Sequence, residues 1–136
     1  MTAAEMERMA LEYFTLVARA DRDGLLELMA PDLRWVVPRG AVEPFAGVHE
    51  GAAHIIDMML GSVGAAFTPG SQKTVPATWT PGEDRIVLEA RIEAEASDGR
   101  RYENEYAFFF EFRNGRIAEI REYVDTRTAA AFFGSA

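Results

Sequence analysis

Three charged side chains could carry out acid–base chemistry beside a wall of aromatic rings. Glu89 and Arg91 lie in a segment of alternating polar and apolar residues, 84–96, and Glu122 lies in the last such segment. The segment between them, 101–112, is rich in Tyr and Phe. Enclosing an ion pair against aromatic rings does not favour stability, so a function would be the better explanation of such an arrangement.

The turn at residues 98–99 decides whether Glu89 and Arg91 face those rings. Successive side chains of a strand point to opposite faces. A two-residue Asp-Gly turn would place Arg91 opposite Tyr106. The same turn would place Glu89 opposite Phe108, so that both charges would share the aromatic face. A loop one residue longer would reverse the register and turn both charged groups to solvent.

The turn at residues 114–115 decides in the same way which side chains of the last strand face the rings. A two-residue turn would put there a set of mixed polarity, Ile117, Glu119, Arg121 and Tyr123. A three-residue turn with Gly115 in a bulge would put there Ala118, Ile120, Glu122 and Val124. The second set is more apolar, so we prefer it, and it brings Glu122 to the aromatic wall.

Hydrogen-bond donors and a reserve base complete the predicted catalytic set. Tyr13 lies on the apolar stripe of a predicted N-terminal helix, and Asn104 is the one amide on the aromatic face of its strand. Asp125 directly precedes a predicted helix, where it would cap free backbone N–H groups, and it is also a reserve base. The predicted ligand-binding wall comprises Trp35, Val37, His54, Met58, Trp79, Asn104, Tyr106, Phe108, Phe110, Ile120 and Val124.

Helices precede strands along the chain. Apolar spacing predicts a first helix over about 3–19 and a third helix over 52–60. Between them, a short second helix is expected to be capped by Asp23 and to end before Pro31. A short strand at 33–37 and a loop at 38–50 lie between the second and third helices. Alternating segments predict strands at about 72–80, 84–96, 101–112 and 117–124, with turns at 81–82, 98–99 and 114–115 and a short closing helix. This order predicts an α+β fold in one domain, 1–136, with the helices on one face of a curved antiparallel sheet.

The composition disfavours several classes of partner. The 136 residues carry a formal net charge of -8, whereas nucleic acids and anionic membrane surfaces call for clustered Lys and Arg. There is no Cys, and His49 and His54 do not share a helix face, so we expect no metal site. No Gly-rich phosphate loop is found, and we expect no cofactor. Without a leader segment or an apolar run of about 20 residues, the expected location is cytoplasmic.

Several short stretches in the second half of the chain are similar to a known superfamily. They are Gly99-Arg-Arg-Tyr102, Tyr106, Phe110, Asn114-Gly-Arg-Ile117 and Glu122-Tyr-Val-Asp-Thr126. They resemble the nuclear-transport-factor-2-like (NTF2-like) superfamily, which includes ketosteroid isomerase, limonene epoxide hydrolase and the SnoaL-like polyketide cyclases. The resemblance implies a cone-shaped α+β barrel, in which a long N-terminal helix and two shorter helices pack on a strongly curved antiparallel sheet around an apolar pocket. It also implies a homodimer through the outer face of the sheet.

The resemblance to ketosteroid isomerase argues against the reaction of that enzyme. Tyr13 matches its oxyanion-hole tyrosine. Val37 and Phe108, however, stand where it keeps its catalytic base and its protonated acid. A hydrocarbon side chain cannot take a proton from carbon.

The other relatives imply roles for four residues. The Arg and two Asp positions of limonene epoxide hydrolase fall on Glu89, Arg91 and Glu122. Arg91 between two carboxyl groups would hold one ionised as a base, while the other, desolvated, would stay protonated as an acid. The acid/base aspartate of the SnoaL-like cyclases falls on Asp125.

The sequence therefore predicts a cofactor-independent enzyme that uses acid–base chemistry of the isomerase, cyclase or hydrolase type. Its substrate would be a small, apolar, oxygen-bearing molecule in an enclosed pocket. The alternative is a non-catalytic module of the same fold that binds a small ligand or dimerises. A carboxyl group with a raised pKa inside the pocket would favour the enzyme. A pocket lined by hydrocarbon and aromatic groups alone would favour the module.

Overall fold

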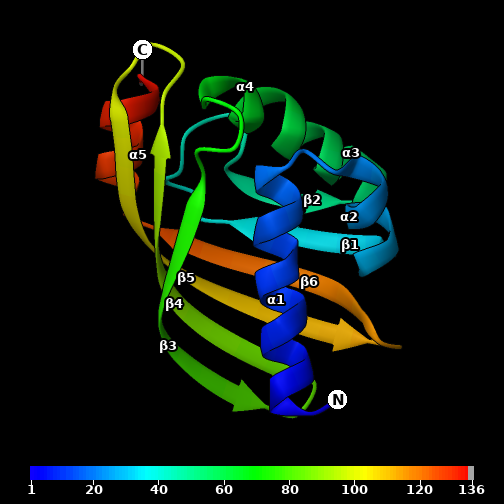
Figure 1. The fold of residues 1–136 in the computed structure, drawn as a ribbon. Coiled ribbons are helices and arrows are strands. Elements are labelled where there is room, and N and C mark those ends of the chain that lie inside the picture. Colours follow the sequence, from blue (N-terminus) through cyan, green and yellow to red (C-terminus); the bar gives the residue numbers. More distant parts are fainter. Residues whose placement is uncertain (135–136) are drawn as a thin grey trace.

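A curved six-stranded sheet wraps around the first helix (Figure 1). The computed structural model describes residues 1–134, with the backbone alone for residues 62–64. The helical elements are α1 (Ala3–Ala18), α2 (Arg22–Leu28), α3 (Ala52–Met58), the π-helical segment η1 (Met59–Val63), α4 (Gly64–Ala66) and α5 (Thr126–Phe133). The strands are β1 (Met29–Val37), β2 (Gly47–Glu50), β3 (Lys73–Gly82), β4 (Arg85–Glu95), β5 (Arg101–Arg113) and β6 (Arg116–Val124).

The sheet is mixed. Its strand order is β2-β1-β6-β5-β4-β3, and neighbours are antiparallel except for β1 and β6, which run parallel. The predicted α+β fold is confirmed, but the prediction of a fully antiparallel sheet is wrong at this pair. The reason is that β1 does not belong to the hairpin series β3–β6. It follows α2 and adds to the free edge of the last strand, where no hairpin sets its direction.

The N-terminal helices follow the apolar pattern, with one change of cap. The Thr2 hydroxyl accepts a hydrogen bond from the Glu5 amide at the start of α1. Asp21, rather than the predicted Asp23, caps α2, because its carboxylate accepts from the Gly24 amide at 2.9 Å. The buried stripe of α1 packs toward the concave face of the sheet and consists of Met6, Ala10, Tyr13 and Leu16.

Residues 29–50 contain more strand than predicted. β1 begins at Met29, so Pro31 lies inside a strand and does not end the helix before it. The pairing of β1 with β6 is interrupted after Met29, so Pro31 does not have to donate to the ladder. The last part of the predicted loop 38–50 is β2, which pairs with β1.

The β4–β5 connection turns Glu89 and Arg91 outward. Glu95 pairs with Arg101, so the five residues 96–100 connect the two strands. A two-residue turn at 98–99 would have paired Glu95 with Tyr102, so the register is shifted by one residue. Ala90 therefore lies opposite Tyr106, and the charged residues of β4 occupy the other face. The prediction that Glu89 and Arg91 face the aromatic rings is wrong.

The β5–β6 hairpin reaches the preferred register by a different route. Its turn has two residues, since Arg113 pairs with Arg116. A bulge at Ala118, and not at Gly115, then shifts the pairing. Beyond the bulge, Ile120, Glu122 and Val124 pair with Phe110, Phe108 and Tyr106, as the apolar pattern predicted.

The β3–β4 turn is shifted along the chain. The predicted turn residues, Pro81 and Gly82, pair with β4 and so belong to β3. The turn is made by Glu83 and Asp84, and Asp84 has a φ of 49°. Asp tolerates this left-handed conformation better than most residues, which is the local reason for the shift.

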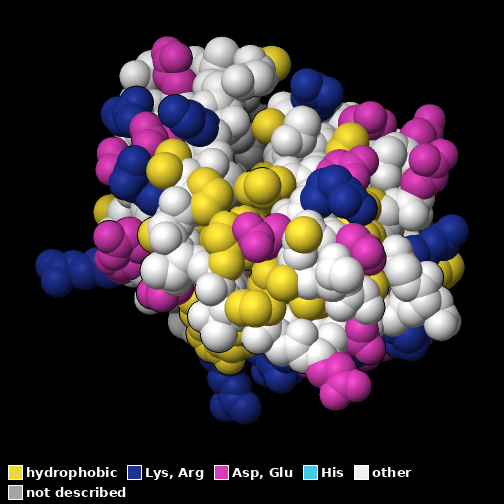
Figure 2. Space-filling model, turned by 60° about the horizontal axis from the view of Figure 1, so that its bottom comes forward, with side chains coloured by type: hydrophobic (Ala, Val, Ile, Leu, Met, Phe, Trp, Pro, Cys, Tyr) yellow, Lys and Arg dark blue, Asp and Glu magenta, His cyan; other side chains and the backbone are white. Residues whose placement is uncertain are grey.

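The two faces of the sheet differ in character. The concave face buries apolar side chains such as Leu88 and Phe110 against α1. The outer face carries ion pairs, and there the rings of Phe109 and Tyr123 meet edge to face with centroids 5.9 Å apart. Seen from the bottom of Figure 1, the surface shows hydrophobic side chains gathered among acidic and basic ones (Figure 2). This face of the molecule is thus amphipathic rather than uniformly charged.

Candidate active site

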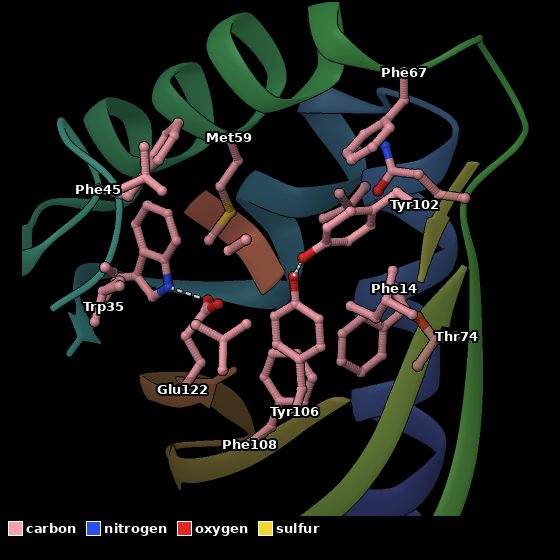
Figure 3. A pocket seen from close by; sticks show the side chains of 18 of the residues that line it. Phe14, Trp35, Phe45, Met59, Phe67, Thr74, Tyr102, Tyr106, Phe108 and Glu122 are labelled. Atoms are coloured by element: carbon pink, nitrogen blue, oxygen red, sulfur yellow. Dashed lines mark hydrogen bonds between the residues drawn. The ribbon is translucent and has the colours of Figure 1, made fainter. Parts of the chain in front are cut away.

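A cavity of about 130 Å³ lies between α1, the concave face of the sheet, the loop after β1, and α5. Most of its wall is hydrocarbon or aromatic ring, contributed by residues such as Phe14, Val17, Val37, Phe45 and Phe108 (Figure 3). Among the described residues that line it, Glu122 is the only carboxylic acid and none is Lys, Arg or His. An apolar cavity with a few convergent polar groups is typical of a site for small molecules.

The carboxyl group of Glu122 is the ionisable acid of this cavity. Glu122 lies on β6 opposite Phe108, and the indole Nε1 of Trp35 donates a hydrogen bond to its Oε1 at 2.5 Å. Burial raises the pKa of Glu122 to about 7, although the hydrogen bond from Trp35 acts in the opposite direction. The acid and base forms are therefore both populated near neutral pH, as a proton-transfer group requires.

Trp35 reaches Glu122 because β1 lies beside β6. Their parallel pairing puts Trp35 next to Ile120, two residues before Glu122 on the same face. The indole ring also lies against Phe45 and His49, with ring centroids 6.2 Å and 5.3 Å away. His49 Nε2 is 2.7 Å from the carbonyl oxygen of Phe45, so these two neighbours are tied to each other. The carboxyl group is thus held by a side chain that is itself packed in place.

Three tyrosine hydroxyls surround the same space. Tyr102 and Tyr106 lie four residues apart on the inner face of β5, with their hydroxyl oxygens 2.6 Å apart (Figure 3). Asn104 Nδ2 donates to the Tyr102 hydroxyl at 2.9 Å. The Tyr13 hydroxyl is directed at Met59 Sδ, 3.6 Å away. Burial raises the pKa of both Tyr13 and Tyr106 well above its ordinary value, so these hydroxyls keep their protons and can donate.

A family model for the SnoaL-like domain matches residues 10–120 of the chain. The chain belongs to the SnoaL-like family. This confirms the resemblance to the NTF2-like superfamily. The chain matches no curated protein.

Solved structures share the fold of this SnoaL-like domain at low sequence identity. A candidate isomerase from Bacillus subtilis is 21% identical over 100% of this chain and 98% of its own, with a TM-score of 0.82. A candidate SnoaL-like polyketide cyclase from Jannaschia sp. CCS1 is 19% identical over 98% of this chain and 94% of its own, with a TM-score of 0.77. An NTF2-like protein of unknown function from Burkholderia pseudomallei is 23% identical over 99% of this chain and 100% of its own, with a TM-score of 0.80. At these identities the likeness shows the NTF2-like fold.

The SnoaL-like cavity brings together part of the predicted set: Tyr13, Trp35, Val37, Tyr106, Phe108, Glu122 and Val124. Phe110 and Ile120 were also predicted to line it, but they are fully buried in the adjoining core. Asn104, with 3% of its surface exposed, lies behind the wall and bonds to Tyr102. Only part of the aromatic face of β5 therefore meets the cavity.

Three further predictions of wall residues are wrong. His54 is exposed, because α3 turns Ile55 and Ile56 toward the core. Met59 lines the cavity in place of Met58, since it continues the buried face of α3 into η1. Trp79 packs against the core farther along β3 than the part of that strand that lines the cavity.

Glu89 and Asp125 have structural partners instead of a place in the cavity wall. Glu89 accepts a hydrogen bond from Thr78 Oγ1 on the outer face at 2.7 Å. Asp125 caps α5, as the sequence predicted, and accepts from the amides of Arg127 and Thr128 at 3.1 Å and 3.2 Å. The hydrogen bond from the Thr128 amide is the main reason why the pKa of Asp125 is lowered, which makes this carboxylate a weak base.

Sequence reasoning missed a large part of the wall. The missed residues include Phe14, Val17, Ala41, Val42, Phe45, Met59, Phe67, Ile92, Tyr102 and Phe133. Tyr102 carried a readable signal, since strand alternation places it on the same face as Tyr106. The residues of the loop after β1 carried none, because a loop has no periodicity that marks an inward side.

Within residues 1–134, no helix combines the length and the apolar character needed to cross a membrane. Among the same residues, no three His, Asp, Glu or Cys side chains gather in a group that could hold a metal ion.

Proposed function

We propose that this SnoaL-like domain is an acid–base enzyme of the isomerase or cyclase kind, with Glu122 as the group that moves the proton. The observation that carries the proposal is a single carboxyl group inside an apolar cavity, with a pKa of about 7. The fold is shared with a candidate isomerase and a candidate polyketide cyclase, which supports the same class of chemistry. A passive binding module would need no titrating group at this place.

The proton transfer uses both forms of Glu122. The ionised carboxylate takes a proton from a carbon beside an oxygen-bearing group, so that a C–H bond breaks and an O–H bond forms on Glu122. The electron pair of the broken bond moves onto the substrate. The protonated carboxyl then returns the proton to the same or another carbon, which balances atoms and charge over the turnover. Because no described lining residue is cationic, a neutral substrate fits this wall best.

A model carbon acid tests the proposal. Cyclohexanone is neutral and has the ring size of benzene, which fills a dry apolar cavity of about 150 Å³. The protein is expected to accelerate the exchange of its C–H protons in heavy water, followed by NMR. Since the ionised form of Glu122 is the base, the rate should rise with pH and level off, with a midpoint near 7. Exchange no faster than in buffer alone, or a rate that does not titrate, would contradict the proposal.

We further propose that two copies of the chain associate through the outer face of the sheet. Tyr123 is 47% exposed there, and its ring lies against Phe109. Ala107 pairs with Tyr123, so the apolar area extends across β5 and β6. An exposed apolar area rimmed by ion pairs is typical of a contact between proteins.

The mass in solution checks this association. The chain should elute in light-scattering chromatography with twice the mass of one chain, and Tyr123→Glu should shift it to the mass of one chain, because a buried unpaired charge opposes contact. Leu11→Glu is the matched control, since Leu11 is 40% exposed on α1, away from this face. A mass of one chain for the unsubstituted protein would refute the association.

A further inference from the structure

The hydrogen bonds of Asn104 have a fixed direction. Its Oδ1 accepts from the Glu105 amide at 2.8 Å, and its Nδ2 donates to the Asp125 carbonyl at 3.1 Å. A backbone N–H can only donate and a backbone carbonyl can only accept, so the amide cannot be turned over. The second proton on Nδ2 therefore goes to the Tyr102 hydroxyl, 2.9 Å away.

This direction decides where the hydroxyl protons lie. Tyr102 is 2% exposed, and apart from Asn104 the hydroxyl of Tyr106 is its only hydrogen-bond partner among the described residues, at 2.6 Å. A buried O–H without an acceptor is unfavourable, so Tyr102 donates to Tyr106. The proton of Tyr106 is then left to point into the cavity, which this side chain lines. Each bond in such a chain polarises the next and makes the last donor stronger.

Two other donors of the wall are already engaged, and the remaining polar side chains of the lining, Gln72 and Thr74, lie just before and at the start of β3. Trp35 Nε1 donates to Glu122, and the Tyr13 hydroxyl is directed at Met59 Sδ. Figure 3 shows the Tyr106 hydroxyl and the Glu122 carboxyl turned toward the same space. A ligand between them would meet a donor on one side and a proton acceptor on the other.

We propose that Tyr106 donates a hydrogen bond to an oxygen atom of the ligand, and that the cavity takes neutral, apolar carbonyl compounds. The inference rests on the proposed function, because it places the ligand oxygen beside the carbon that Glu122 would deprotonate. The negative charge that builds up on that oxygen would then face a donor already oriented for it. Asn104 and Tyr102 are positioning residues, since they act through Tyr106.

A different ligand class makes an opposite prediction. A protonated amine would be drawn to the Glu122 carboxylate and to the faces of the surrounding rings. A protonated amine has no lone pair, so it could not accept the hydrogen bond that the Tyr106 hydroxyl donates into the cavity. Cyclohexanone, methylenecyclohexane and protonated cyclohexylamine share one ring size and differ in one group, so they separate a carbonyl site from a purely apolar site and from a cation site.

The test is a binding comparison by NMR titration of the intact protein with these three compounds. Tyr106→Phe should weaken the binding of cyclohexanone about tenfold, which is the loss expected for one buried hydrogen bond. The affinity for methylenecyclohexane should not change. Tyr123→Phe makes the same chemical change on the outer face and should alter neither. Unchanged binding of methylenecyclohexane also shows that the variant is folded.

Several outcomes would overturn the inference: equal affinity of wild type and Tyr106→Phe for the ketone, an equal loss for both neutral compounds, tighter binding of the amine than of the ketone, or no binding of any of them. The proposed function fails separately. If the ketone binds through Tyr106 but its protons do not exchange, the inference stands and the acid–base proposal falls. If proton exchange depends on Glu122 but the affinity for the ketone does not depend on Tyr106, the acid–base proposal stands and the inference about Tyr106 falls.

Discussion

Glu122→Gln is expected to slow the protein-catalysed proton exchange of cyclohexanone by about 100-fold or more, the usual contribution of a positioned general base. Glutamine has the same shape and can still accept the hydrogen bond that Trp35 Nε1 gives to Glu122. It cannot take up a proton. The loss should therefore appear in the exchange rate and not in the affinity for the ketone, and the rise of the rate near pH 7 should disappear with it.

The matched control for this variant is Glu89→Gln. Glu89 carries the same carboxyl group on the outer face of the sheet, where it accepts from Thr78. Its replacement should leave the exchange rate as it is in the wild type. A Glu122→Gln protein that exchanges ketone protons as fast as the wild type would remove Glu122 from the mechanism, whatever the affinity for the ketone.

The contrast between Glu122 and Glu89 also shows what the sequence could and could not predict. The inward side of β6 was readable because only one register gave an apolar set, and the fold accepts a bulge at Ala118 to reach it. The alternation of β4 on its own favours charged side chains that face solvent, and Glu89 and Arg91 do so. The inward prediction depended on a two-residue turn at 98–99, whereas residues 96–100 connect the two strands.

The partner of Glu122 depended on contacts that are distant in sequence. Trp35 and Glu122 meet because β1 pairs with β6 in parallel, and 87 positions separate them. Periodicity predicts that a strand exists and which of its residues share the apolar face, but not which strand will lie beside it. The helices, the four hairpin strands and the cap at Asp125 were local and were predicted, whereas the walls supplied by the loop after β1 were not.

The same Glu122→Gln substitution is expected to change how stability depends on pH. An ordinary glutamic acid has a pKa of 4.5, and burial raises that of Glu122 to about 7 in the folded state. Between these values the folded chain holds a proton that the unfolded chain has released. The stability that Glu122 contributes is therefore fully present below pH 4.5 and is lost as the pH rises through about 7. Between pH 5 and 8 the loss is on the order of 2–3 kcal/mol.

Urea unfolding of both proteins at several pH values measures this difference. All other carboxylates and the caps are shared, so their titration cancels when the Glu122→Gln curve is subtracted from that of the wild type. The wild type should lose on the order of 2–3 kcal/mol relative to the variant as the pH is raised from 5 to 8, and Glu89→Gln should follow the wild type. A constant difference between wild type and Glu122→Gln across this range would mean that the carboxyl group titrates as if in water. The cavity would then lack the acid–base group on which the proposed chemistry depends.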